Sequence, residues 1–131
     1  MAGTFKFELV SPEKVLLSGD ASEAIVPGMD GQFTVLPGHA PVISTLKPGR
    51  MRVTVDGRER SAFVRGGVVE VEPDSVTVLA QHLIDLDGEN RREAIDAEIK
   101  YAEELLAAAK DDTERMVVQE ALVQLRHFAV H

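Results

Sequence analysis

The sequence predicts a β-sandwich over residues 1–86 followed by an antiparallel two-helix hairpin over residues 87–131, an α+β chain in two domains. Three observations predict this fold class. Short apolar runs alternate with polar residues throughout the first part. Turn pairs containing glycine or proline separate these runs at close spacing, which is typical of sandwiches and barrels. After Asp87-Gly88 the apolar period becomes helical.

The first strand is predicted by Phe5, Phe7 and Leu9, which alternate with charged residues at the period of a half-buried strand. Ser11-Pro12 ends it, because proline has no amide hydrogen to give to a ladder. Further apolar runs predict the remaining strands, at residues 15–17, 24–26, 33–36, 51–55, 62–64, 69–71 and 76–78.

Turn chemistry connects these strands. Asp56-Gly57 lies between two apolar runs and predicts a two-residue hairpin turn. Pro73-Asp74 predicts a second hairpin-like connection, and Gly66-Gly67 is expected to mark a β-bulge. No helical stretch separates the strands, so we expect no parallel pairing, which requires a crossover connection.

The helical part carries two apolar stripes. The first recurs at alternating steps of four and three residues and comprises Ile95, Ile99, Ala102, Leu106 and Ala109. The second comprises Val118, Leu122, Leu125 and Ala129. The connection between them is very short, so the two helices should fold back on each other.

Lys110-Asp111-Asp112 interrupts the stripes. Asp111 is the expected N-cap of the second helix, with Glu114 three residues later in the capping-box arrangement.

Alanine buries less apolar area than leucine, and it supplies much of the expected inner face, at Ala94, Ala102, Ala108, Ala109 and Ala121. We therefore expect a weakly held hairpin attached to a stable β domain.

Composition excludes several classes of function. The chain has 14 basic and 22 acidic residues and a net charge of −8, which disfavours nucleic-acid binding. The absence of cysteine removes disulfides, thiolate metal sites and cysteine nucleophiles. No apolar run approaches the roughly 20 residues of a membrane helix, and the first residues lack a signal-peptide layout, so we expect a soluble chain that is not exported by that route.

Candidate catalytic and metal-binding residues are few. His127 and His131 lie four residues apart, but no glutamate follows His127 and His131 ends the sequence, so we expect no metal site. No Gly-x-Ser-x-Gly elbow or phosphate-binding loop occurs, and the paired carboxylates lie on the predicted helices or their turn. We expect no catalytic residue and no cofactor. His39 has two open interpretations: an interaction residue, or a turn residue that bonds only its own backbone.

Several sequence blocks occur in a distinctive order. They are Glu8-Leu9-Val10-Ser11-Pro12-Glu13-Lys14 with Ser18-Gly19, then residues 31–41 ending in Pro37-Gly38-His39-Ala40-Pro41, then Lys47-Pro48-Gly49, residues 66–71 and residues 76–80. Together they resemble the epsilon subunit of F-type ATP synthases, and Pro-Gly-His-Ala-Pro is the most specific block. Over the helices the resemblance rests on architecture, alanine content and Tyr101-Ala102-Glu103-Glu104-Leu105.

The resemblance implies a non-catalytic subunit of the central stalk, with a β-sandwich and a helix hairpin. Such a subunit binds the gamma subunit, contacts the ring of c subunits and rotates with both, coupling proton transport to ATP synthesis. In many bacteria the hairpin also inhibits ATP hydrolysis by extending beside gamma, near the alpha and beta subunits. The implied location is the cytoplasmic face of the bacterial plasma membrane, ahead of an organellar equivalent.

Carried over residue by residue, the resemblance assigns His39, Ala40 and Pro41 to the gamma interface. It assigns the turn Met29, Asp30, Gly31 and Gln32 to the c-ring interface. Many relatives have an acidic residue where this chain has Gln32, so either Asp30 supplies the carboxylate or the ring contact is weaker.

The sequence departs from the family at the start of the first helix. Relatives that bind ATP carry an Ile/Leu-Asp-x-x-Arg-Ala string there, whereas this chain has Leu86-Asp87-Gly88-Glu89-Asn90-Arg91-Arg92. We therefore expect no useful ATP affinity. The competing hypothesis is a stand-alone β-sandwich adaptor whose helix hairpin binds an unrelated protein partner.

Overall fold

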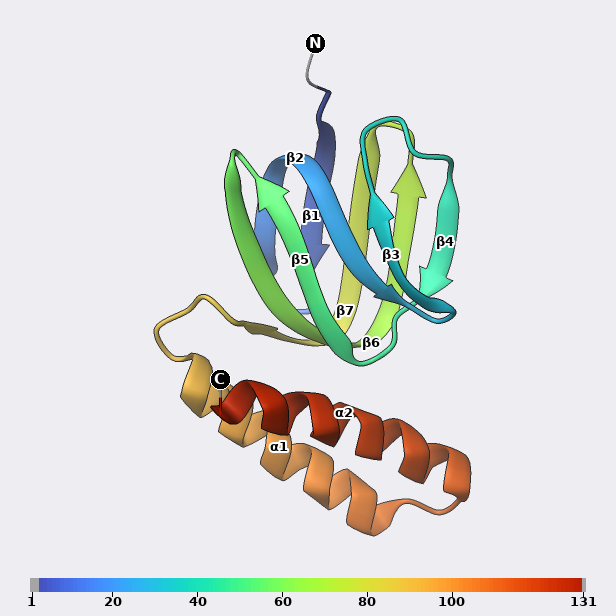
Figure 1. Cartoon of the computed structure of the whole chain (residues 1–131). Coiled ribbons are helices and arrows are strands. Elements are labelled where there is room, and N and C mark those ends of the chain that lie inside the picture. Colours follow the sequence, from blue (N-terminus) through green and yellow to red (C-terminus); the bar gives the residue numbers. More distant parts are fainter. Residues whose placement is uncertain (1–2, 131) are drawn as a thin grey trace. The chain divides into compact units, whose positions relative to one another are not determined.

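A computed structural model describes residues 3–130 and divides the chain into two compact units, Met1–Leu86 and Asp87–His131 (Figure 1). The first unit is β-rich and the second is helical, as the sequence predicted. The strands are β1 (Phe5–Val10), β2 (Val15–Gly28), β3 (Gly31–Val35), β4 (Val42–Thr45), β5 (Gly49–Val55), β6 (Arg58–Glu72) and β7 (Ser75–Asp85).

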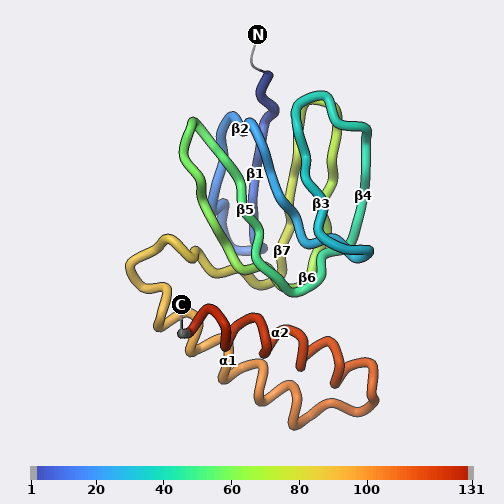
Figure 2. Tube along the Cα trace, viewed as in Figure 1, coloured from blue at the N-terminus to red at the C-terminus, as the bar shows by residue number. Residues whose placement is uncertain are grey.

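The strands form one strongly curved sheet in the order β1-β7-β6-β5-β2-β3, with β4 beside β6. Because β1 also pairs with β2, the sheet closes on itself around an interior (Figures 1 and 2). Closure leaves β3 and β4 as the outlying strands, joined to the rest through β2 and β6 respectively.

One pairing contradicts the sequence-based expectation. β1 and β7 are parallel, from Lys6↔Ser75 to Val10↔Leu79. The expectation was wrong because it considered only helical crossovers. Here the connection between the two parallel strands consists of all the strands between them, β2 to β6.

The expected bulge at Gly66-Gly67 is also wrong. β6 and β7 keep one register across this point, from Arg65↔His82 to Gly67↔Ala80. Both glycines have positive φ, and a Cβ on Gly67 would lie 1.8 Å from the carbonyl oxygen of Leu79. The glycines instead lie where β6 changes its other partner, from β5 up to Val64 to β4 from Val68.

Both predicted hairpins are confirmed. Asp56 and Gly57 have φ of 51° and 80° and join Val55 to its ladder partner Arg58, the conformation of a type I′ turn. Pro73-Asp74 joins Glu72 to its ladder partner Ser75 between β6 and β7, without the positive φ values of the first turn.

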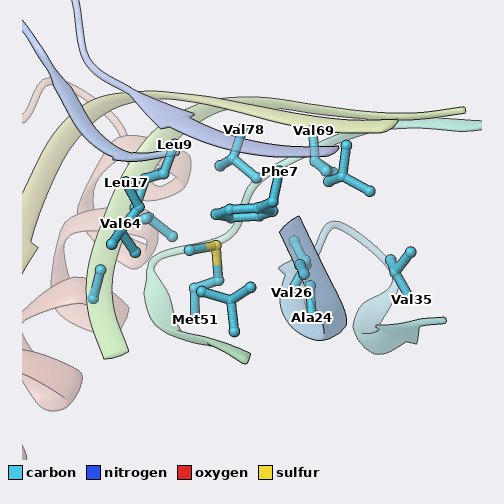
Figure 3. Packing of buried hydrophobic residues seen from close by; sticks show 14 of the residues in the cluster. Phe7, Leu9, Leu17, Ala24, Val26, Val35, Met51, Val64, Val69 and Val78 are labelled. Atoms are coloured by element: carbon cyan, nitrogen blue, oxygen red, sulfur yellow. The ribbon is translucent and has the colours of Figure 1, made fainter. Parts of the chain in front are cut away.

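Alternation along the strands fills the interior with apolar side chains. Figure 3 shows Phe7 from β1 facing Met51 from β5 and Val26 from β2. All three side chains are essentially inaccessible to solvent. Full burial of a side chain of this size contributes about 1.5–3 kcal/mol relative to exposure. The main cluster draws on every strand except β4, whose half-buried Val42 packs against it, and extends from Phe5 to Ala80 in sequence.

The second unit consists of α1 (Arg91–Ala108) and α2 (Asp112–Val130), packed as a hairpin. Its buried residues lie mainly on the predicted stripes: Ile95, Ala102, Ala121, Leu122 and Leu125. Ala94 and Ala108, expected on the inner face, are exposed, so the apolar contact is narrower than predicted. Within residues 3–130, neither helix is long and apolar enough to cross a membrane.

Candidate interaction surfaces

The loop after β3 is held in a defined conformation. The amide of His39 donates to the carbonyl of Leu36 at 3.1 Å, closing a turn with Pro37 second and Gly38 third. Gly38 has φ of +79°, the value that the third position of a type II turn requires. The amide of Gly38 also donates to the carbonyl of Pro73 at 3.1 Å. The loop is therefore fixed to the β6–β7 turn beside it (Figure 2).

His39 is half-buried in this loop, whereas Ala40 and Pro41 are exposed. Its Nδ1 lies 2.8 Å from the carbonyl oxygen of Ala40. A carbonyl oxygen can only accept, so Nδ1 carries the hydrogen and Nε2 of the neutral ring is the acceptor. The backbone bond of the second interpretation is thus present. This bond orients the imidazole and leaves Nε2 able to accept a hydrogen bond, so His39 can still be an interaction residue.

The β2–β3 turn projects a different set of groups. Gly28 pairs with Gly31, and between them Met29, 51% exposed, and Asp30 form the tip. Gln32 is exposed beside it on β3. The following part of the chain holds the base of this turn, because Gly28 forms a bridge with Leu46 and the amide of Lys47 donates to the carbonyl of Pro27 at 3.0 Å.

The two predicted interfaces are separate surfaces rather than one site. The tip of the turn, Met29 and Asp30, precedes β3, and the loop containing His39 follows it, so the two surfaces lie at opposite ends of this strand (Figure 1). The five residues of β3, at about 3.3 Å each, place this tip roughly 15 Å from the start of that loop.

Sequence reasoning missed a third feature, on the outward side of β1, β7, β6 and β4. The register places Val10 beside Leu79 and Leu79 beside Val68, and all three point away from the core residues that alternate with them. Ile43 on β4 is 75% exposed on the same side, paired with Glu70. We call Val10, Ile43, Val68 and Leu79 the outer apolar face.

This face contains a shallow depression of about 270 Å³. It is lined by Val10, Ser11, Pro12, Gly67, Val68, Leu79, Ala80 and Gln81. The available sequence signal was the pairing of consecutive apolar residues, such as Val68-Val69 and Val78-Leu79, where strict alternation would place a polar one. The sequence alone could not show that the outward residues Val10, Val68 and Leu79, which lie on different strands, are neighbours in the sheet.

In the helical unit the predicted N-cap is confirmed, because the carboxylate of Asp111 accepts from the amide of Glu114 at 2.8 Å. Arg126 of α2 donates to a carboxylate oxygen of Glu103 of α1 at 3.1 Å. His127 makes an edge contact with Phe128, with ring centroids 5.7 Å apart, and His131 lies outside the described residues. Across residues 3–130 no group of three or more metal-ligating side chains is present.

Residues 4–85, more than half of the chain, match the family described as ATP synthase, Delta/Epsilon chain, beta-sandwich domain. The chain belongs to this family. It is 44% identical to the ATP synthase epsilon chain of Parvibaculum lavamentivorans over 97% of this chain and 94% of that one. It is 41% identical to the ATP synthase epsilon chain of Maricaulis maris over 88% and 86% of the two chains.

Solved structures of ATP synthases contain chains with the same fold. A chain of the Euglena gracilis mitochondrial enzyme, in a structure of OSCP, F1 and the c-ring, matches with a TM-score of 0.71 and 19% identity over 98% of this chain and 82% of that one. A chain from the central stalk and c-ring of the Tetrahymena thermophila enzyme matches with 0.70 and 13%, over 95% and 96%.

These findings confirm the resemblance to epsilon subunits that the sequence blocks indicated. Family members are subunits of a larger complex, so the hypothesis of a stand-alone adaptor is not favoured.

Proposed function

We propose that this family member is a non-catalytic subunit of the central stalk of an F-type ATP synthase. It links the gamma subunit to the c-ring and so couples proton transport to ATP synthesis. The observation that carries this proposal is 44% identity to a bacterial epsilon chain over nearly the whole chain. The bacterial relatives support a location at the cytoplasmic face of the plasma membrane, peripheral to the membrane part of the complex.

The gamma interface is proposed to comprise His39, Ala40 and Pro41 together with the outer apolar face. β4 begins directly after Pro41, so the loop and Ile43 are continuous. Exposed apolar side chains around a depression suit a protein partner, because apolar patches left exposed on a protein surface mark interaction sites.

The ring interface is proposed to comprise Met29, Asp30, Gly31 and Gln32. Of these residues Asp30 alone is charged, and it lies at the exposed tip of the turn. A basic loop of the ring would pair with Asp30 while Met29 supplies apolar contact. Because Gln32 is neutral, this contact has one carboxylate and is weaker than a contact with two. Like any exposed ion pair, the pair formed by Asp30 contributes about 0–1 kcal/mol.

The helical unit is proposed to inhibit ATP hydrolysis by changing conformation and contacting the alpha and beta subunits. It carries 6 basic and 11 acidic residues, and α2 exposes Met116, Val117 and Val123. A narrow, alanine-rich contact between the helices suits a unit with two conformations that differ by only a few kcal/mol in free energy.

Assembly of the complex tests both roles. We expect the full chain to co-migrate with ATP synthase subunits when membranes are solubilised, and to restore coupling to a complex lacking it. ATPase rates should be lower with the full chain than with residues 1–86. A chain that stays monomeric in membrane extracts and restores nothing would contradict the stalk assignment and favour an adaptor.

A further inference from the structure

Strand β4 lies between the two proposed interfaces. Its adjacent residues Ile43 and Ser44 point to opposite sides: Ile43 pairs with Glu70 on the outer apolar face, and Ser44 pairs with the buried Val69. One side of this short strand therefore belongs to the proposed gamma surface. The other side bears the hydroxyl of Ser44.

That hydroxyl reaches the β2–β3 turn. The amide of Met29 donates to Oγ of Ser44 at 3.3 Å, and Oγ donates to the carbonyl of Thr45 at 2.9 Å. The two bonds are compatible, because a hydroxyl has one hydrogen to give and lone pairs to accept with. The backbone contacts at Pro27 and Gly28 hold only the base of the turn, whereas Ser44 holds the first residue of its tip.

We propose that Ser44 is a positioning residue that ties the tip of the ring-facing turn to the strand carrying part of the gamma surface. Load on Met29 and Asp30 then passes into β4 and from there to the gamma interface, instead of bending the turn. This inference rests on the proposed function, since it assigns a role within the ring and gamma contacts.

Two substitutions of nearly equal shape isolate the hydroxyl. Ser44→Thr keeps the acceptor and Ser44→Val replaces it with a methyl group, and both suit a strand. In the full chain, amide hydrogen exchange followed by NMR should show several-fold faster exchange of the Met29 amide in Ser44→Val than in Ser44→Thr. The amide of Asp56, bonded to the carbonyl of Asp20 in another turn, is the internal control and should be unchanged.

The second measurement is binding of the gamma–epsilon complex to purified c-ring in detergent. Relative to Ser44→Thr, Ser44→Val should weaken ring binding about threefold to tenfold without changing gamma binding. Equal Met29 exchange in the two variants would overturn the tie, and equal ring binding would overturn its role in positioning.

Met29→Ala and Asp30→Asn test the ring assignment itself. If neither weakens ring binding, the proposed ring interface is wrong; if they do and Ser44→Val does not, only the role of Ser44 is wrong.

Discussion

A carboxylate oxygen of Asp111 accepts a hydrogen bond of 2.8 Å from the amide of Glu114, three residues later. Glu114 in turn accepts from the amide of Lys110 at 2.9 Å, one residue before the position that an ideal capping box uses. The first helical bond of α2 runs from the amide of Arg115 to the carbonyl of Asp111. At the start of α2, two backbone amides, those of Lys110 and Glu114, thus donate to side-chain carboxylates.

Removing this cap should loosen the helical unit. Asp111→Ala is expected to cost about 1 kcal/mol of hairpin stability, because one amide loses its partner. Local hydrogen exchange in α2 measures it. Asp111→Asn is the matched control and should retain most of the stability, since asparagine caps as well as aspartate. Equal losses in both variants would show that charge, not capping, is responsible.

Gly67→Ala should prevent the β domain from folding stably. The new methyl group would lie 1.8 Å from a carbonyl oxygen of β7, at a φ of +121° that alanine avoids. We expect a loss of more than about 4 kcal/mol in urea denaturation. Gly57→Ala provides the comparison, because its φ is +80° but no atom lies within 4 Å of the new Cβ, so it should cost only about 1–2 kcal/mol.

Residues 1–86 alone should fold and bind gamma. The main apolar cluster lies entirely between Phe5 and Ala80, with Leu83 packed against it, and both proposed interfaces lie within the fragment. Cooperative thermal unfolding and a gamma pull-down would measure this. An unfolded fragment, or a folded one that does not bind, would contradict the proposed division of roles.

His39→Ala should affect gamma binding more than stability. The loop backbone is fixed by the turn at Leu36 and by the bond to Pro73, neither of which uses the imidazole. If the imidazole is a central contact with gamma, its loss costs about 2 kcal/mol of binding free energy, measurable by calorimetry. A lowered melting temperature with unchanged gamma affinity would show that His39 serves only the fold.

ATP should not bind the isolated chain at useful affinity. Arg91 and Arg92 are adjacent on α1, so their side chains diverge by about 100° and cannot converge on one phosphate. Arg126, the remaining candidate on α2, is already paired with Glu103. Isothermal titration is expected to show no saturable binding below about 1 mM, equivalent to about −4 kcal/mol. Saturation in that range would overturn the prediction.

Local chemistry explains what the sequence could predict. The Asp56-Gly57 hairpin and the Asp111 cap each depend on residues only a few positions apart, and both are present. The strand alternation likewise identified the core, because the period of two determines which side chains face inward.

The remaining features depend on contacts that are distant in sequence. The parallel ladder and the meeting of Val10 with Leu79 follow from the order of strands, which no local period encodes. The same holds for the bond between Met29 and Ser44, and for the anchoring of the His39 loop at Pro73. The loops could therefore be recognised from their residues, but the outer apolar face could not.

The parallel ladder also determines when the β domain can be completed during synthesis. β1 leaves the ribosome long before β7 has been made, so until then β1 has β2 on one side and an open edge on the other. Open edges invite pairing with other chains, and contacts between such distant residues form slowly. The closed sheet, and with it the surface that a partner would bind, therefore cannot form until β7 has been synthesised.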